Sequence, residues 1–192
     1  MTRLLLTLAA IGLIGYGIFF ALFGSTTYIW HQRLTVIVDT PAGQVQGAAV
    51  TEVRISEFYN ARANFGTGSS SDITGEAVVV EVLPGRYLFA LLDGGENYKG
   101  AAKAWAYVTF KQRDYPDQNQ IPSGEFQILI RTEPRDTPIP LPPEAMPLLV
   151  TFDDITDPTT VRLVDPTNLS ASFGPGVSLA GLTLEITQAD VT

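Results

Sequence analysis

The densest group of side chains capable of chemistry comprises Asp153, Asp154 and Asp157. Hard cations such as Ca²⁺ take several oxygen ligands from one short loop, so these three carboxylates are candidate metal ligands. The alternative is structural, because aspartate residues that follow a strand cap turns through their side-chain oxygens. A second oxygen-rich loop contains Asp114, Asp117 and Asn119.

Pairs of carboxylates could also act as acid and base in a hydrolase. Glu76 and Glu81 lie on one expected strand but point to opposite faces, and the same holds for Glu52 and Glu57. His31 is the single histidine and lies beside an expected membrane segment, and the chain has no cysteine. We therefore expect no catalytic residue and no cofactor.

Residues 4–23 are almost entirely apolar and carry no charge. Twenty helical residues span about 30 Å, which matches the hydrocarbon layer of a bilayer. The stretch is longer than the apolar core of a cleaved signal peptide, and Leu22-Phe23-Gly24 is a poor cleavage site. We therefore expect a transmembrane helix over residues 4–24 that anchors the chain in the lipid bilayer.

The distribution of basic residues around this segment predicts its orientation. Arg3 precedes the segment, and the next arginine or lysine is Arg33. The positive-inside rule then makes residues 1–3 a cytoplasmic tail and exports the remainder across the membrane, which in a bacterium would be the inner membrane with a periplasmic domain. Tyr28 and Trp30, in an expected juxtamembrane linker over residues 25–33, are candidates for the membrane interface.

Small residues recur along the expected transmembrane helix. Ala10, Gly17, Ala21 and Gly24 fall on one face, and such spacing lets two helices pack closely. A homodimer through this face is one interpretation. The other is that membrane helices are rich in glycine and alanine without pairing.

Net charge limits the partners of the exported part. The chain carries −8, and all twenty acidic residues follow the apolar segment together with eleven of the twelve basic residues. Binding to nucleic acid needs a basic surface, so the composition excludes that class of partner. It also argues against attraction to anionic headgroups.

Alternating hydrophobicity predicts a mainly-β domain over residues 34–132, without a helix. Residues 60–75 are small and polar, and we expect a loop there. The apolar faces of the strands would be buried in an antiparallel β-sandwich. The six expected strands cover residues 34–39, 48–58, 76–83, 86–92, 101–111 and a segment with Phe126, Ile128 and Ile130 on one face.

Prolines separate this domain from the C-terminal part. Residues 133–147 are proline-rich and should form an extended connector that cannot pair inside a sheet. Strands are expected at 148–152 and 177–186. Since a segment as short as 148–192 rarely holds a core alone, we expect a small subdomain that packs on the sandwich or on a partner.

Two stretches resemble a known class of domain. Residues 34–53, with the turn at Pro41-Ala42-Gly43, resemble the opening of carboxypeptidase-regulatory-like and Cna-B-like domains. Residues 75–88, with the turn at Pro84-Gly85, are similar to a later hairpin of those domains. The resemblance implies a transthyretin-type, Ig-like sandwich over residues 34–92 and says little about function. Residues 152–177 resemble a segment of small uncharacterised bacterial envelope proteins.

Together these features predict a membrane-anchored, non-enzymatic envelope protein whose sandwich binds or scaffolds another envelope protein. Two alternatives stay open: a carboxylate-dependent hydrolase of the envelope that uses Ca²⁺, and a structural accessory subunit of a membrane complex. A cleft with three converging carboxylates would favour the hydrolase. An apolar patch or an open sheet edge would favour the binding module.

Overall fold

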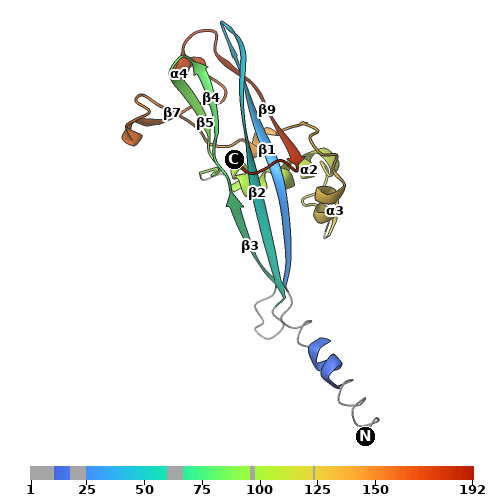
Figure 1. Ribbon diagram of the computed structural model, residues 1–192. Coiled ribbons are helices and arrows are strands. Elements are labelled where there is room, and N and C mark those ends of the chain that lie inside the picture. The colour runs from blue at the N-terminus through green and yellow to red at the C-terminus, as the bar shows by residue number, and fades with distance from the viewer. Residues whose placement is uncertain (1–10, 18–24, 60–66, 96–97, 123) are drawn as a thin grey trace. The chain divides into compact units, whose positions relative to one another are not determined.

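The structure is a computed structural model that describes residues 11–17, 25–59, 67–95, 98–122 and 124–192. It is mainly β, with two antiparallel sheets of five and four strands, an arrangement consistent with a β-sandwich (Figure 1). The five-stranded sheet has the order β3-β2-β1-β9-β6, and the four-stranded sheet the order β4-β5-β7-β8. The strands are β1 (Ser25–Thr40), β2 (Gly43–Tyr59), β3 (Thr67–Thr74), β4 (Val78–Leu83), β5 (Arg86–Ala90), β6 (Ile139–Pro140), β7 (Leu149–Phe152), β8 (Val161–Leu163) and β9 (Ser178–Thr187).

The chain divides into two compact units. One comprises Met1–Ile29 and Arg54–Asp72, in which the side chains of Thr27 and Ser56 share a hydrogen bond of 3.1 Å between neighbouring strands. The other comprises Trp30–Val53 and Ile73–Thr192 and contains the four-stranded sheet and the helices described below.

Strict alternation along β1 gives the five-stranded sheet a buried inner face. Residues 30, 32, 34, 36 and 38 are buried, whereas residues 31, 33, 35 and 37 are half-buried. The four-stranded sheet packs on this face at Gly47, where an added Cβ atom would lie 2.1 Å from the carbonyl oxygen of Val79. Only a residue without a side chain fits there, because backbone meets backbone. Gly47 therefore marks where the two sheets meet.

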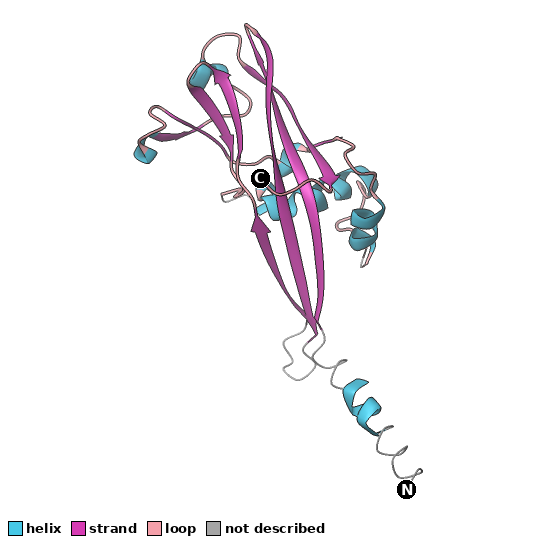
Figure 2. Ribbon diagram, viewed as in Figure 1, coloured by secondary structure: helices cyan, strands magenta, loops and turns pink. Residues whose placement is uncertain are grey.

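Two helices, shown in cyan in Figure 2, occupy segments that we expected to be strands. They are α2 (Ala102–Asp114) and α3 (Glu125–Thr132), so the strand predictions at 101–111 and around Phe126–Ile130 are wrong. The buried side chains of α2 include Ala102, Trp105, Ala106 and Phe110, which is the spacing of a helical face. Alternating aromatic and aliphatic residues in this segment imitated the period of a strand.

The helices are fixed to the inner face by specific contacts. The fully buried Gln32 side chain donates a hydrogen bond of 2.7 Å to the carbonyl oxygen of Ala102 and accepts one from the Trp30 indole. Trp30 also packs edge-on against Phe126 of α3, with ring centroids 5.6 Å apart. Its ring is only 5% exposed, so Trp30 belongs to the core and not to a membrane surface.

The C-terminal part is built into both sheets. β9 lies between β1 and β6, with Leu34 opposite Leu184, and β7 pairs with β5. The proline-rich segment supplies β6, where Pro140 is tolerated because β6 is the edge strand of its sheet. Short helical turns complete this part: η2 (Pro143–Ala145), η3 (Pro158–Thr160) and α4 (Ser170–Phe173).

The loop expected over residues 60–75 is wrong for residues 67–74, which form β3. Residues 60–66 lie outside the described part. Of the predicted transmembrane segment, residues 11–17 are helical and the remainder lies outside the described residues. Where the structure describes the chain, none of its helices has the length and apolar character needed to cross a membrane.

Candidate functional site

The outer face of the four-stranded sheet is almost entirely apolar. Its other face is buried, as the alternation of buried and exposed residues along β4 shows. Because paired residues of antiparallel strands share a face, the strand register identifies the outer positions. We call the set the outer apolar face; it comprises Val79, Glu81, Tyr87, Phe89, Val150, Phe152, Val161 and Leu163.

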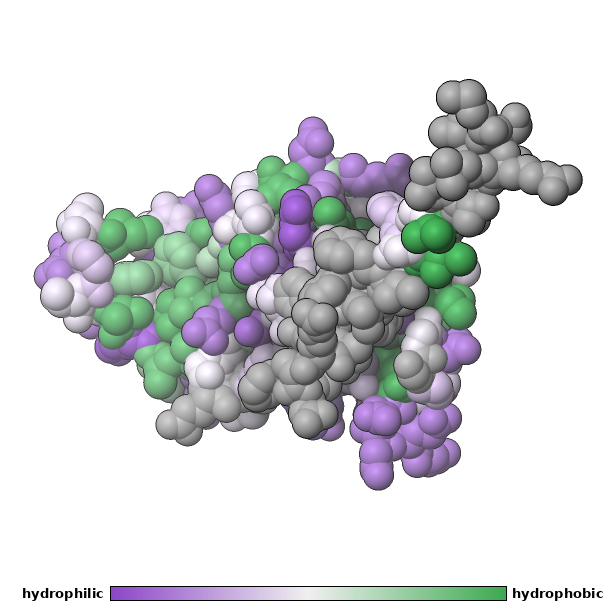
Figure 3. Space-filling view, turned by 90° about the horizontal axis from the view of Figure 1, so that it is seen from below, coloured by the Kyte–Doolittle hydropathy of each residue, from purple (hydrophilic) through white to green (hydrophobic). Residues whose placement is uncertain are grey.

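The parts of this face on β4 and β8 are open to solvent, whereas Val150 of β7 is only 4% exposed. Leu163 is 70% exposed, Val161 48% and Val79 45%. Between them the rings of Phe89 and Phe152 pack edge to face, with centroids 5.3 Å apart. In Figure 3 apolar side chains gather on the left, the side on which β7 lies in Figure 1. Exposed apolar patches of this kind mark interaction surfaces.

An unpaired strand edge borders the same face. β8 pairs with β7 on one side and ends the strand order, so no further described strand covers its other side. The N–H of Asp153 donates to the carbonyl oxygen of Thr160, and the N–H of Val164 donates to that of Leu149. In an antiparallel pair, hydrogen-bonded residue pairs alternate with pairs that are not hydrogen-bonded to each other. By that alternation the backbone groups of Val161 and Leu163 point away from β7. The N–H of Val161 donates to the carbonyl oxygen of Pro158, which leaves at this edge the C=O of Val161 and the N–H and C=O of Leu163. They form an open edge at which another strand could pair.

Acidic side chains surround this edge. Asp153 forms an ion pair with Arg162 of β8. Asp154, Asp157 and Asp165 each accept two hydrogen bonds from the threonine two residues later, one from its hydroxyl and one from its backbone N–H. These bonds lower the pKa of each carboxyl, and the bond from the hydroxyl has the larger effect. The three therefore stay ionised at neutral pH, next to the apolar face.

The turn-capping interpretation of the aspartate cluster is confirmed for two of its members. Asp157 caps η3 by accepting a 2.9 Å hydrogen bond from the N–H of Thr159, and Asp154 accepts one of 2.8 Å from the N–H of Thr156. No group of three or more acidic or histidine side chains suited to a metal ion occurs in the described part of the chain. In the other candidate loop, Asp114 pairs with Arg113.

Arg113 binds two further carboxylates, those of Glu133 and Asp114. Its guanidinium forms hydrogen bonds of 2.7 and 2.8 Å with Glu133 and of 2.8 Å with Asp114. These bonds raise the pKa of Arg113 above its ordinary value, and the bonds to Glu133 have the largest effect. The pair joins the C-terminal ends of α2 and α3.

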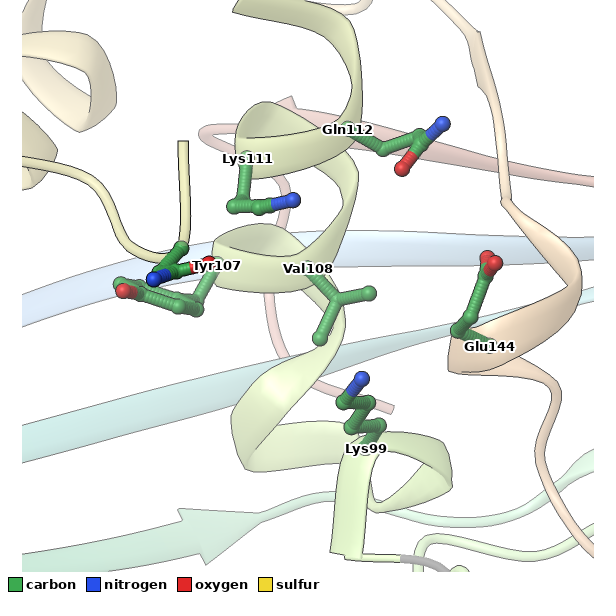
Figure 4. Close-up of a pocket in the computed structure, with 7 residues that line it drawn as sticks. Lys99, Tyr107, Val108, Lys111, Gln112 and Glu144 are labelled. Carbon is green, nitrogen blue, oxygen red and sulfur yellow. The ribbon is translucent and has the colours of Figure 1, made fainter. Parts of the chain in front are cut away.

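A pocket of about 210 Å³ lies beside α2 (Figure 4). Residues of η1 (Tyr98–Gly100), α2, the following loop and η2 line it: Lys99, Tyr107, Val108, Lys111, Gln112, Asn119 and Glu144. Sequence reasoning missed this pocket because it took α2 for a strand. A signal was present, since the three lysines of this acidic chain all lie between positions 99 and 111, and two of them, Lys99 and Lys111, line the pocket.

His31 lies on the half-buried face of the five-stranded sheet. Its Nδ1 is 2.7 Å from the carbonyl oxygen of Ala189, so this nitrogen carries the proton of the hydrogen bond. Its Nε2 is 3.5 Å from a carboxylate oxygen of Glu52. Nearby, Arg33 pairs with Glu185 and with Asp136. These contacts join β1 to β2, β9 and the C-terminal segment, which is a structural role.

The other predicted site residues can be placed only in part. Tyr28 lies in β1, in the first of the two units, and Gly17 lies in the helical residues 11–17. Ala10, Ala21 and Gly24 fall outside the described residues. The membrane interface at Tyr28 and the helix pairing through Gly17 therefore stay predictions.

Comparisons with protein-family models, with curated proteins and with solved structures find no match for this chain. The resemblance of residues 34–92 to transthyretin-type domains thus stays a prediction.

Proposed function

We propose that this protein is a membrane-anchored, non-enzymatic binding module that pairs a strand of a partner protein with β8. The open edge at Val161 and Leu163 carries the proposal. Main-chain bonds along an edge supply affinity in strand addition, and alternate side chains supply specificity. Since β8 is short, the outer apolar face next to it would provide the larger part of the buried contact.

The chemistry of the partner strand follows from its surroundings. Side chains that alternate towards the outer apolar face would meet Phe152, Val161 and Leu163, so apolar residues are expected at every second position. Asp154, Asp157 and Asp165 remain ionised around the edge. A partner segment with basic residues between or beside its apolar ones would therefore be favoured over an acidic one.

A short synthetic peptide of alternating valine and lysine tests this proposal on the full-length protein. Hydrogen exchange should slow at the amide of Leu163 when the peptide is added, and a valine–glutamate peptide of equal length should leave it unchanged. Leu163→Ser should weaken binding. Ile128→Ser, at a position 49% exposed on α3, is the matched control and should bind as the parent does.

The contrary results are equally specific. Exchange at the amide of Leu163 that is unaffected by either peptide would refute strand addition at β8. Equal protection by both peptides would refute the expected basic character of the partner while leaving the edge as the site.

A further inference from the structure

We infer that the pocket beside α2 is a binding site for a small organic carboxylate, separate from the edge at β8. The first observation is the concentration of positive charge. The chain carries −8 overall, yet its three lysines all lie between residues 99 and 111. Lys99 and Lys111 line the pocket, while Lys103 lies over the ring of Tyr98, 5.1 Å from its centroid.

The pocket is built on a fixed frame. An added Cβ atom at Gly100 would lie 2.3 Å from the carbonyl oxygen of Met146, so η1 and the segment after η2 are in close backbone contact. The Trp105 indole donates a 2.8 Å hydrogen bond to the carbonyl oxygen of Gly100. Trp105 is 1% exposed and holds η1 against α2. Lys99 and Glu144 are thereby presented from opposing short helical turns.

Hydrogen-bond donors dominate the lining. The hydroxyl oxygen of Tyr107 accepts a 3.1 Å bond from the N–H of Ile121, which leaves its own proton available for a ligand. In Figure 4 the side chains of Lys99 and Lys111 extend from opposite ends towards the space beside Val108. The amides of Gln112 and Asn119 add further donors.

The charge and size of the pocket select the class of ligand. The lining contains two ammonium groups, Lys99 and Lys111, and one carboxylate, Glu144, so its net charge is +1, which suits a single anionic group. The Lys111 ammonium also lies 3.4 Å from the carbonyl oxygen of Pro116, a neutral partner that leaves its charge uncompensated. Val108 and the ring of Tyr107 offer apolar contact to the remainder of a ligand. A volume of about 210 Å³ admits a small molecule. A carboxylate attached to a short apolar group meets these three conditions.

The small number of lysines makes a direct test possible on the full-length protein. Labelling with ¹³C-lysine gives only three side-chain signals, which the single variants Lys99→Gln, Lys103→Gln and Lys111→Gln assign. Titration with benzoate should shift the signals of Lys99 and Lys111 to saturation and leave that of Lys103 unchanged. Lys111→Gln should weaken the response of Lys99 roughly tenfold or more, the loss expected for one charged hydrogen bond.

Two further probes and one variant complete the test. Lys103→Gln should bind benzoate with unchanged affinity, since Lys103 is not among the lining residues. Benzyl alcohol, which lacks the charge, should not produce the shifts, and shifts of equal size would refute anion binding. Inorganic phosphate that binds as tightly as benzoate would refute the carboxylate class. Equal shifts at all three lysines would indicate charge screening only and would overturn the site.

Discussion

The contact at Gly47 yields a sharp prediction about how the two sheets pack. A methyl group added there would lie 2.1 Å from the carbonyl oxygen of Val79 and 2.9 Å from its carbonyl carbon. Cβ atoms essentially never approach closer than 3.0 Å, so the sheets would have to separate by about 0.9 Å. Both neighbouring atoms are backbone, so no change of rotamer relieves the contact.

The expected cost follows from this geometry. Overpacking a core typically costs about 1–3 kcal/mol, and a clash with backbone belongs at the upper end. For a protein of this size, about 3 kcal/mol corresponds to a decrease in Tm of about 6–12 °C. Gly47→Ala should therefore melt clearly below the parent protein in a thermal scan followed by near-UV circular dichroism.

Gly181→Ala is the matched control, because Gly181 lies in β9 of the same sheet and an added Cβ atom there meets nothing within 4 Å. Its effect should range from neutral to stabilising by up to about 1 kcal/mol, through the lower entropy of the unfolded chain. If the two variants melted at the same temperature, β4 would not pack against β2 at Gly47, and the arrangement of the sheets described above would be refuted.

Three further predictions concern other parts of the chain. Leu184→Ala should lower the free energy of unfolding by about 2–5 kcal/mol in a urea titration, because Leu184 is 1% exposed and lies opposite Leu34. A decrease as small as that of a surface substitution would contradict this placement of β9. The lowered pKa values of Asp154, Asp157 and Asp165 mean that their turns stabilise the fold above pH 3.8 and lose this contribution as the pH falls through the lowered values. The triple Asp→Asn variant should therefore show a smaller decrease in Tm on acidification than the parent, and an equal decrease would assign acid sensitivity to other groups. The predicted anchor over residues 4–23 should keep the protein in the membrane fraction after a carbonate wash with its N-terminus intact; N-terminal sequencing that begins near Ser25 would show a cleaved signal peptide instead.

Local patterns in the sequence predicted the hairpins well. Alternation along residues 34–39 and 86–92, together with Pro84-Gly85, identified β1, β5, which ends at Ala90, and the turn before β5, where Gly85 has a φ of 72°. These elements depend on neighbouring residues and on the turn chemistry of glycine and proline. The structure extends β1 back to Ser25 and so places Trp30 in a core strand.

Long-range features could not be predicted in this way. Nothing local to 102–114 shows that Gln32 would bind the carbonyl oxygen of Ala102 and fix a helix there. The exposure of Val161 and Leu163 depends on which strand ends the sheet, and their short segment carried no recognisable strand signal. The pocket needs η1, α2 and η2 together, so its lining could not be assembled from spacing alone.

The pairing of β1 with β9 has a consequence for how the protein folds. His31 lies opposite Thr187, so these partners are separated by about 150 residues of chain. Closing so long a loop costs entropy before any contact repays it, and folding slows as such contacts come to dominate. During synthesis, the β1–β2 hairpin would wait with one edge of β1 unpaired until β9 emerges. The exposed apolar strands would be open to aggregation during that interval. The chain is therefore most open to aggregation before residue 178 is available.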